Sequence, residues 1–306
     1  MRTAPVLLTY DIHIHARHPA PDVERYLLHV VEDHRRTGVK ASFFFPAEAA
    51  RLMKGSVRLL LQEGHQIGCH GLTHRNETYD SMPPAVQRET LTRATREIED
   101  VIQQRVTFFR APVSKISAET IRILEELGYE ADLSMSSQRL GVFSSDMWNV
   151  TWLFAPRLPY HPDVKRPWRR GASKLWEIPL SCLGLPFMVN TGLIFGATFM
   201  KAFFRGLYLE SCWNQKPIVY MVHPEDLYPW QAAPWRAPFR WREVVPNRVD
   251  GLSFKYRLFE TDPVKIARDC QELAEYMRSF PRVRFLTVPE YVAELGRRAE
   301  ASSGHA

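Results

Sequence analysis

Polar side chains of two chemical types alternate near the start of the sequence, in the stretch LTYDIHIH at residues 8–15. The stretch begins as an apolar strand and then carries Asp11, His13 and His15. Residues i, i+2 and i+4 of a β-strand lie on one face. An acid that can accept a proton and imidazoles that can bind a metal ion are therefore predicted on the same side of this strand.

A second pair of histidines, His70 and His74, follows another short apolar stretch in GHQIGCHGLTH. If this segment turns helically, the i, i+4 spacing places both imidazoles on one face, where they can share a metal ion. Taken alone, such a pair is more often two unrelated surface histidines. Because the pair directly follows a strand, as DIHIH does, we interpret it as part of a metal site.

The apolar stretches that carry these residues alternate with helical patterns along the chain. Strands are predicted at residues 5–15, 40–46, 65–71, 106–112, 130–136, 174–181 and 216–224. Helices are predicted at residues 21–38, 47–64, 84–105, 117–129 and 262–280. Repeated alternation of this kind indicates a parallel sheet with helices outside. About seven units suit a barrel, whose active site lies at the C-terminal ends of its strands.

Two segments interrupt this alternation, at residues 147–172 and 228–257, and both are rich in Trp, Pro and Arg. Long loops inside a compact domain are usually functional or disordered, and the aromatic content favours order. We expect a single domain over residues 1–306, with these loops over one end of the barrel and a disordered tail at 298–306. Candidates for contact with a ligand in these loops are Trp152, Trp230, Trp235 and Trp241.

The stretches LLTYDIHIH, KASFFFP, GHQIGCHGLTH, FFRAP and VYMVHPEDL occur in the order and spacing of the polysaccharide deacetylase family, which the chain resembles from residue 5 to about residue 228. The HxxxH element is the most specific of them, whereas RxP alone is weak. The resemblance implies an α/β fold, a distorted (β/α) barrel of about seven parallel strands with outer helices. It also implies a metal-dependent hydrolase that removes N- or O-acetyl groups from sugars.

The resemblance further implies a metal site. In the family an aspartate at the position of Asp11 is the general base, and a second acid nearby binds the metal. Here Ile12 and His13 stand where that acid is expected. His13 lies on the same strand face as Asp11, so we expect His13, His70 and His74 to hold one divalent ion, with Zn²⁺ the first choice for three neutral imidazoles.

The remaining catalytic roles also follow from the resemblance. Arg110 corresponds to the arginine that orients the base, although a surface salt bridge would be an ordinary alternative. His223, at the end of the last strand, corresponds to the general acid, and an imidazole that titrates near neutrality can protonate a departing amine. A buried carboxylate should orient His223. We predict Asp132 for this role, with Asp226 as the rival.

Two other functions compete with this interpretation. An amidohydrolase or PHP-phosphoesterase would use the HxH pattern with His13 and His15 both as ligands, but FFFP, GHQIGCHGLTH and FFRAP would then be unexplained. A catalytically silent carbohydrate-binding barrel is suggested by the missing ligand acid. The presence of Asp11, Arg110 and His223 together with both histidines of HxxxH argues against loss of function.

Composition limits partners and location. The net charge is +6, but the basic residues are scattered and no nucleic-acid motif is present, so no nucleic-acid partner is expected. Four cysteines without CxxC spacing, and an N-terminus without a signal-peptide pattern, favour the cytoplasm. The expected substrate is an acetylated sugar that is nucleotide- or lipid-linked. The nearly uncharged segment 181–204 favours a lipid carrier and peripheral membrane contact, although we interpret it first as a buried strand end, loop and helix.

Overall fold

The computed structural model describes residues 3–14, 18–75, 77–139, 150–227, 238–245 and 252–303. In this part of the chain eight strands form one sheet, and every strand pair in it is parallel. The strands are β1 (Ala4–Asp11), β2 (Ser42–Phe45), β3 (Gln66–Cys69), β4 (Phe108–Phe109), β5 (Ala131–Asp132), β6 (Trp176–Glu177), β9 (Ile218–Val222) and β10 (Val283–Phe285). A separate antiparallel pair is made by β7 (Cys182–Leu183) and β8 (Leu185–Pro186).

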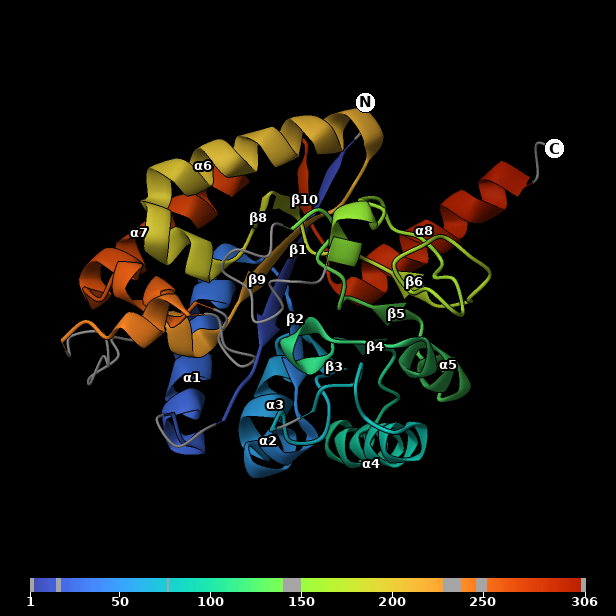
Figure 1. The fold of residues 1–306 in the computed structure, drawn as a ribbon. Helices are drawn as coiled ribbons and strands as arrows, with labels where there is room; N and C mark the ends of the chain where they lie inside the picture. Colours follow the sequence, from blue (N-terminus) through green and yellow to red (C-terminus); the bar gives the residue numbers. More distant parts are fainter. Residues whose placement is uncertain are drawn as a thin grey trace.

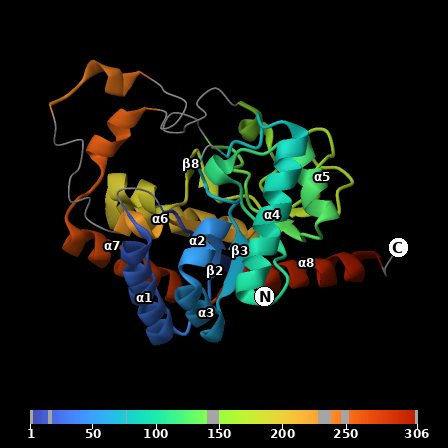
Figure 2. The same cartoon turned by 90° about the horizontal axis from the view of Figure 1, so that it is seen from below.

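Helices surround this sheet (Figure 1). The helices α1 to α5 lie along one side of the strands, and α6, α7 and α8 cover the rest (Figures 1 and 2). The α-helices are α1 (Ala20–Thr37), α2 (Ala47–Leu52), α3 (Lys54–Gln62), α4 (Pro84–Ile102), α5 (Ala118–Glu126), α6 (Val189–Asn214), α7 (Pro263–Arg278) and α8 (Val288–Ser303). Short 3-10 turns are η1 (Pro112–Ser114), η3 (Val150–Phe154), η4 (Pro224–Leu227), η6 (Trp241–Val244) and η7 (Ser253–Leu258).

Seven strands follow one another around a curved half-barrel, in the order β9, β1, β2, β3, β4, β5 and β6. The eighth strand, β10, pairs with Ala4–Val6 of β1, on the edge that β2 occupies from Thr9 onward. The segment after β6 bridges toward β9, where Val219 N donates to Ser181 Oγ at 3.0 Å and Met188 pairs with Met221. The predicted class, a distorted barrel of about seven parallel strands with outer helices, is confirmed.

The local sequence explains several of these elements. The residues of β2, SFFF, are all buried, as expected for a central parallel strand covered on both faces. Helix α1 ends at Gly38, which adopts φ 69° and donates its N–H to His34. Helix α5 begins with a capping box in which Ser117 and Thr120 satisfy each other's backbone N–H groups.

The structure differs from the sequence-based elements at three places. The single helix predicted at residues 47–64 is divided at Met53, whose ψ of 38° breaks the helical path between α2 and α3. The helix interpreted within the apolar segment 181–204 is present as the first part of α6, but it continues to Asn214 and is kinked at Gly196 with φ 76°. The disordered tail expected from residue 298 is wrong for residues 298–303, because α8 continues to Ser303.

The predicted loop insertions are only partly described. Within residues 150–172 the chain forms η3 and an irregular hairpin in which Pro162 pairs with Arg170. Trp152 is 4% exposed and packs with Met135 and Ala155, so it is not available for stacking on a sugar. Trp241, in contrast, is 67% exposed, while Trp230 and Trp235 lie outside the described residues. None of the described helices has the length and apolar character needed to cross a bilayer.

Candidate metal centre and active site

Three histidines from two strand ends meet in one cluster. His13 follows β1, and His70 and His74 follow β3. One ring nitrogen from each lies within 4.8 Å of the others, and the Nε2 atoms of His13 and His70 are 3.3 Å apart. Nitrogen ligands at about 2.0–2.1 Å from a tetrahedral Zn²⁺ are separated by about 3.3–3.4 Å. The cluster therefore has the donor type and the spacing that a small divalent ion requires.

The environment of the rings favours neutral imidazoles with free nitrogen lone pairs. Burial lowers the pKa of His70 and of His74, so both stay uncharged at neutral pH. His70 Nδ1 lies 2.8 Å from the carbonyl oxygen of Arg110, to which it can only donate. The proton of a neutral His70 is therefore on Nδ1, and Nε2 is left to bind a metal ion.

His74 reaches the cluster through a tight turn and not through a helix. Residues 70–75 are irregular, with φ 82° at Gly71 and φ 64° at His74, so the helical turn predicted for HxxxH is wrong. The buried carboxylate of Glu77 holds this turn by accepting the backbone N–H groups of Leu72 at 2.8 Å and His74 at 3.0 Å. It also accepts from Thr73, through both its backbone N–H and its hydroxyl, and from the Tyr79 hydroxyl.

Gly71 is required by this arrangement. A Cβ atom at that position would lie 2.3 Å from Glu77 Oε2 and 3.0 Å from the Tyr79 hydroxyl, in addition to the strain of the positive φ. Glu77 is a functional residue that the sequence analysis missed. A sequence signal for Glu77 was present. An acid three residues after HxxxH can accept the backbone N–H groups of the turn that precedes it.

Asp11 and Arg110 form a buried ion pair. Arg110, 1% exposed, places one guanidinium nitrogen 2.6 Å from Asp11 Oδ1 and also donates to the Thr9 hydroxyl and the Leu133 carbonyl. Burial alone would raise the pKa of Asp11, but Arg110 and the nearby histidines outweigh it and lower that pKa to about 2. Arg110 is therefore no surface salt bridge, and Asp11 is held ionised and in a fixed orientation.

His223 lies beside the same cluster, directly after β9. Its ring centroid is 4.9 Å from that of His13. Its Nδ1 atom is 2.9 Å from Asp226 Oδ2 and 3.3 Å from Asn190 Oδ1. The prediction that Asp132 orients His223 is wrong, since Asp226, one turn further along in η4, makes that contact. The sequence signal for Asp226 was its i, i+3 spacing from His223 in HPED, just after the strand.

Comparison with known proteins shows what the N-terminal part of the chain is similar to. Residues 2–131 match the family model described as polysaccharide deacetylase. The resemblance to polysaccharide deacetylases is confirmed. The matched region holds the DIHIH and HxxxH motifs and Arg110, and it ends at the first residue of β5.

Sequence relatives and solved structures agree with this result. "Peptidoglycan deacetylase-like protein FGM2" of Gibberella zeae is 26% identical over 113 residues, which are 36% of this chain and 33% of that protein. "Putative polysaccharide deacetylase YheN" of Bacillus subtilis is 30% identical over 94 residues, 30% of this chain and 33% of that protein. The match thus spans about a third of the length of each relative.

Among solved structures, the "putative polysaccharide deacetylase from Mycobacterium smegmatis" superposes with a TM-score of 0.63 at 15% identity, covering 97% of this chain and 92% of that one. PuuE allantoinase superposes with a TM-score of 0.60 at 13% identity, covering 95% and 90%. At these identities the likeness shows the fold, and a fold shared with an allantoinase does not by itself fix the substrate.

The chain also carries a pair of buried acids beside the site. Asp132, at the end of β5, and Glu177, at the end of β6, are adjacent in register and both fully buried. Burial raises the pKa of Asp132 to about 6 and the pKa of Glu177 well above its usual range. Asp132 Oδ1 accepts from the Ser134 hydroxyl, and Glu177 Oε1 from Met135 N. Two buried acids side by side are expected to share one proton at neutral pH.

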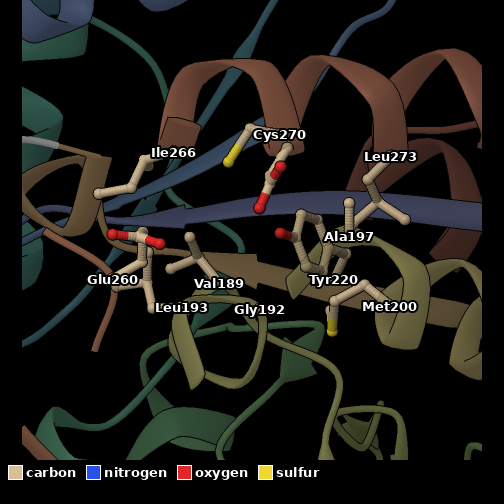
Figure 3. Close-up of a pocket in the computed structure, with 11 residues that line it drawn as sticks. Val189, Gly192, Leu193, Ala197, Met200, Tyr220, Glu260, Ile266, Cys270 and Leu273 are labelled. Carbon is tan, nitrogen blue, oxygen red and sulfur yellow. The ribbon is translucent and has the colours of Figure 1, made fainter. Parts of the chain in front are cut away.

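An apolar cavity of about 350 Å³ lies away from the histidines, between α6, α7 and β9 (Figure 3). Its lining includes Val189, Leu193, Met200, Tyr220 and Cys270, and none of the residues predicted to act in catalysis. His15, which the amidohydrolase-like alternative requires as a ligand, lies outside the described residues.

Proposed function

We propose that the protein is a metal-dependent deacetylase that removes an N-acetyl group from a sugar-containing substrate. The observation that carries the proposal is the placement of an ionised acid, Asp11, and a carboxylate-oriented imidazole, His223, around one cluster of three neutral imidazoles. Amide hydrolysis needs a base for the attacking water and an acid for the leaving amine. Family membership of residues 2–131 supports the sugar as the substrate class.

The donor set fits a metal ion. Three neutral imidazole nitrogens and an open side are typical of catalytic zinc sites. His13, His70 and His74 would hold the ion, and His13 would take the place of the acid that the family normally supplies. When bound there, a divalent ion supplies Lewis-acid polarisation of a water molecule and of the acetyl carbonyl.

The protein's own groups divide the proton transfers between them. Asp11 Oδ1 accepts from Arg110, which also donates to the Thr9 hydroxyl, so the other carboxylate oxygen of Asp11 can accept a proton from water without loss of orientation. Asp226 accepts the Nδ1 proton of His223, which directs the other ring nitrogen, Nε2, toward the cluster side for proton donation to the amine. The base and the acid are thus two separate groups beside the histidine cluster.

The amidohydrolase-like alternative makes His15 a metal ligand, whereas here His70 and His74 of HxxxH already complete a set of three with His13. The silent-barrel alternative is opposed by the ion pair of Asp11 with Arg110 and by the Asp226–His223 contact, which a binding module does not need. These observations favour an active hydrolase over both alternatives.

Acetate release tests the proposed function. The full chain is loaded with Zn²⁺, and in parallel with Co²⁺, and offered N-acetylglucosamine oligomers, a nucleotide-linked N-acetyl sugar and a polyprenyl-phosphate-linked N-acetyl sugar. We expect acetate from at least one of them and none from the His74→Ala variant. A metal-loaded protein that binds a sugar but releases no acetate or other acyl group from any of the three would support the silent barrel.

A further inference from the structure

A second cavity, of about 520 Å³, opens beside His223. It is lined by Arg139, Leu185, Pro186, Met188, Asn190, Thr191, Ile194, Phe195, Lys255 and Phe259. Asn190 connects it to the active site, because its Oδ1 atom lies 3.3 Å from His223 Nδ1. Met188 pairs with Met221 in the strand that leads to His223. A ligand in this cavity would therefore lie next to the catalytic acid.

The first turns of α6 separate this cavity from the one in Figure 3. Val189 and Leu193, four residues apart, face the apolar cavity, whereas Asn190 and Ile194 line the cavity beside His223. The helix therefore presents a mixed polar and apolar face to the active-site side. Its N-terminal N–H groups lack intrahelical acceptors and add partial positive charge there.

The charge of this cavity is positive. Its described lining contains two cations, Arg139 and Lys255, and no Asp or Glu. The guanidinium of Arg139 stands 5.9 Å from the centre of the Trp152 ring, and no ion pair with an acid is found for it in the described part of the chain. Burial lowers the pKa of Arg139, with only the Cys182 thiol opposing the effect. A desolvated cation is stabilised when an anion joins it.

The opposite wall of the cavity is apolar and reaches the surface. Ile194, Phe195 and Phe259 form this wall, and Phe195 remains 44% exposed. The Phe195 ring packs against Phe199, one turn further along α6, at a centroid distance of 4.8 Å and an interplanar angle of 35°. An apolar chain that leaves the cavity would thus continue along an exposed aromatic strip.

We propose that this cavity binds the phosphate and the first apolar units of a lipid-linked sugar, an inference that rests on the proposed function. The phosphate lies against Arg139, the acyl-bearing sugar extends past Asn190 toward His223, and the lipid follows Phe195 and Phe199 outward. A nucleotide-linked sugar is the weaker choice, because a ribose and a base need polar partners that the wall of Ile194, Phe195 and Phe259 does not offer.

Binding to the metal-loaded full chain tests this assignment without any turnover. The probes are geranylgeranyl phosphate, geranylgeraniol, inorganic phosphate and a nucleotide-linked N-acetyl sugar, measured by calorimetry below the micelle concentration of the lipids. We expect geranylgeranyl phosphate to bind at least about tenfold more tightly than each of the other three probes, because only it engages both walls. Equal affinity for inorganic phosphate or for the nucleotide-linked sugar would overturn the lipid assignment.

Substitutions of Arg139 and of Phe195 test where the ligand binds. Arg139→Gln should weaken geranylgeranyl phosphate binding roughly tenfold to a hundredfold, as expected for loss of a charged hydrogen bond, whereas Arg139→Lys should keep most of it. Phe195→Ser should weaken geranylgeranyl phosphate but not inorganic phosphate. Arg36→Gln, an exposed arginine at the C-terminal end of α1, is the matched control. Unchanged lipid affinity in Arg139→Gln would overturn the site.

The proposed hydrolase activity and the proposed lipid-phosphate site can be refuted independently of each other. If lipid phosphate binds as expected but no substrate releases an acyl group, the proposed function is wrong and the cavity remains an anionic-lipid site. If acetate is released from soluble sugars while lipid phosphate does not bind, the hydrolase stands and this further inference is wrong.

Discussion

His13 and His70 direct their Nε2 atoms to within 3.3 Å of each other, although the two residues are 57 positions apart in the chain. Strands β1 and β3 are not neighbours, because β2 lies between them. The two rings nevertheless contact each other, and His74 reaches them from a turn that Glu77 holds by hydrogen bonds. Three imidazoles from separate parts of the chain therefore meet at one place.

The first prediction concerns the identity of the third ligand. His13→Ala should remove tight metal binding, because two histidines are left to hold the ion. His13→Asp should recover binding at least in part, since a carboxylate oxygen ligates zinc at a distance similar to that of an imidazole nitrogen. Metal content after gel filtration, by elemental analysis, is the measurement. His15→Ala serves as the comparison: if it empties the site while His13→Asp fails to hold metal, the assignment of His13 is wrong.

The second prediction separates the base from the metal site. Asp11→Asn keeps the size of the side chain and its contact with Arg110 but cannot accept a proton. It should retain wild-type metal content and lose roughly 10²–10⁴ in turnover, the usual contribution of a positioned base. Acetate release and metal content are measured on the same preparation. A variant that keeps full turnover would show that another group takes the proton from water.

The third prediction tests the carboxylate that orients His223. Asp226→Asn should lower kcat by at least about tenfold, since a neutral amide neither fixes the tautomer nor stabilises the protonated ring as a carboxylate does. Because His223 acts as a general acid, it is expected to determine the basic limb of the kcat–pH profile. That limb should shift as well. Glu48→Gln, an acid at the surface of α2, is the control. An unshifted profile with normal kcat would assign Asp226 a purely structural role.

The fourth prediction concerns the turn that carries His74. Glu77→Gln should weaken metal binding roughly tenfold to a hundredfold, because an amide offers fewer acceptor sites than a carboxylate to the donors that converge there. The metal dissociation constant, from competition with a chelator, is the measurement. Glu89→Gln, an exposed acid on α4, is the matched control. Equal affinity in the two variants would show that the turn does not depend on Glu77.

The fifth prediction uses the buried acid pair. The pKa of Asp132 is raised to about 6 in the folded protein and is about 4 when unfolded, so the folded state keeps a proton that the unfolded state releases between these values. The contribution of Asp132 to stability is thus fully present below pH 4 and is lost as pH rises to 6. Asp132→Asn removes this loss and keeps the acceptor for Ser134.

The free energy of unfolding, from guanidinium titrations at pH 4.5 and pH 7.5, checks this effect. Relative to wild type, Asp132→Asn should gain stability at the higher pH by up to about 3 kcal/mol, the free energy equivalent of the pKa shift. Because only the difference between the two proteins is compared, the titrating groups that do not interact with Asp132 cancel, and the effect is that of the Asp132–Glu177 pair. The same change between the two pH values in both proteins would show that Asp132 does not hold the proton.

The sequence by itself determined the fold class and most of the site. Apolar stretches alternating with amphipathic helices require a parallel sheet with outer helices, because each stretch must be covered on both faces. In such a sheet the residues that follow strands gather at one end. Asp11, His13, His70, Arg110 and His223 could therefore be placed together from their positions after predicted strands.

Only the tertiary structure decided which side chains touch. Asp132 and Asp226 are both acids near strand ends. The i, i+3 spacing of HPED makes Asp226 a possible partner of His223, but only the register of β5 and β6 shows that Asp132 lies against Glu177 instead. The path of HxxxH likewise depends on Gly71 and Glu77, whose close approach forces positive φ angles in place of a helix. Spacing along the chain fixes the face of a strand, whereas partners across the barrel depend on register and turn geometry, which packing sets.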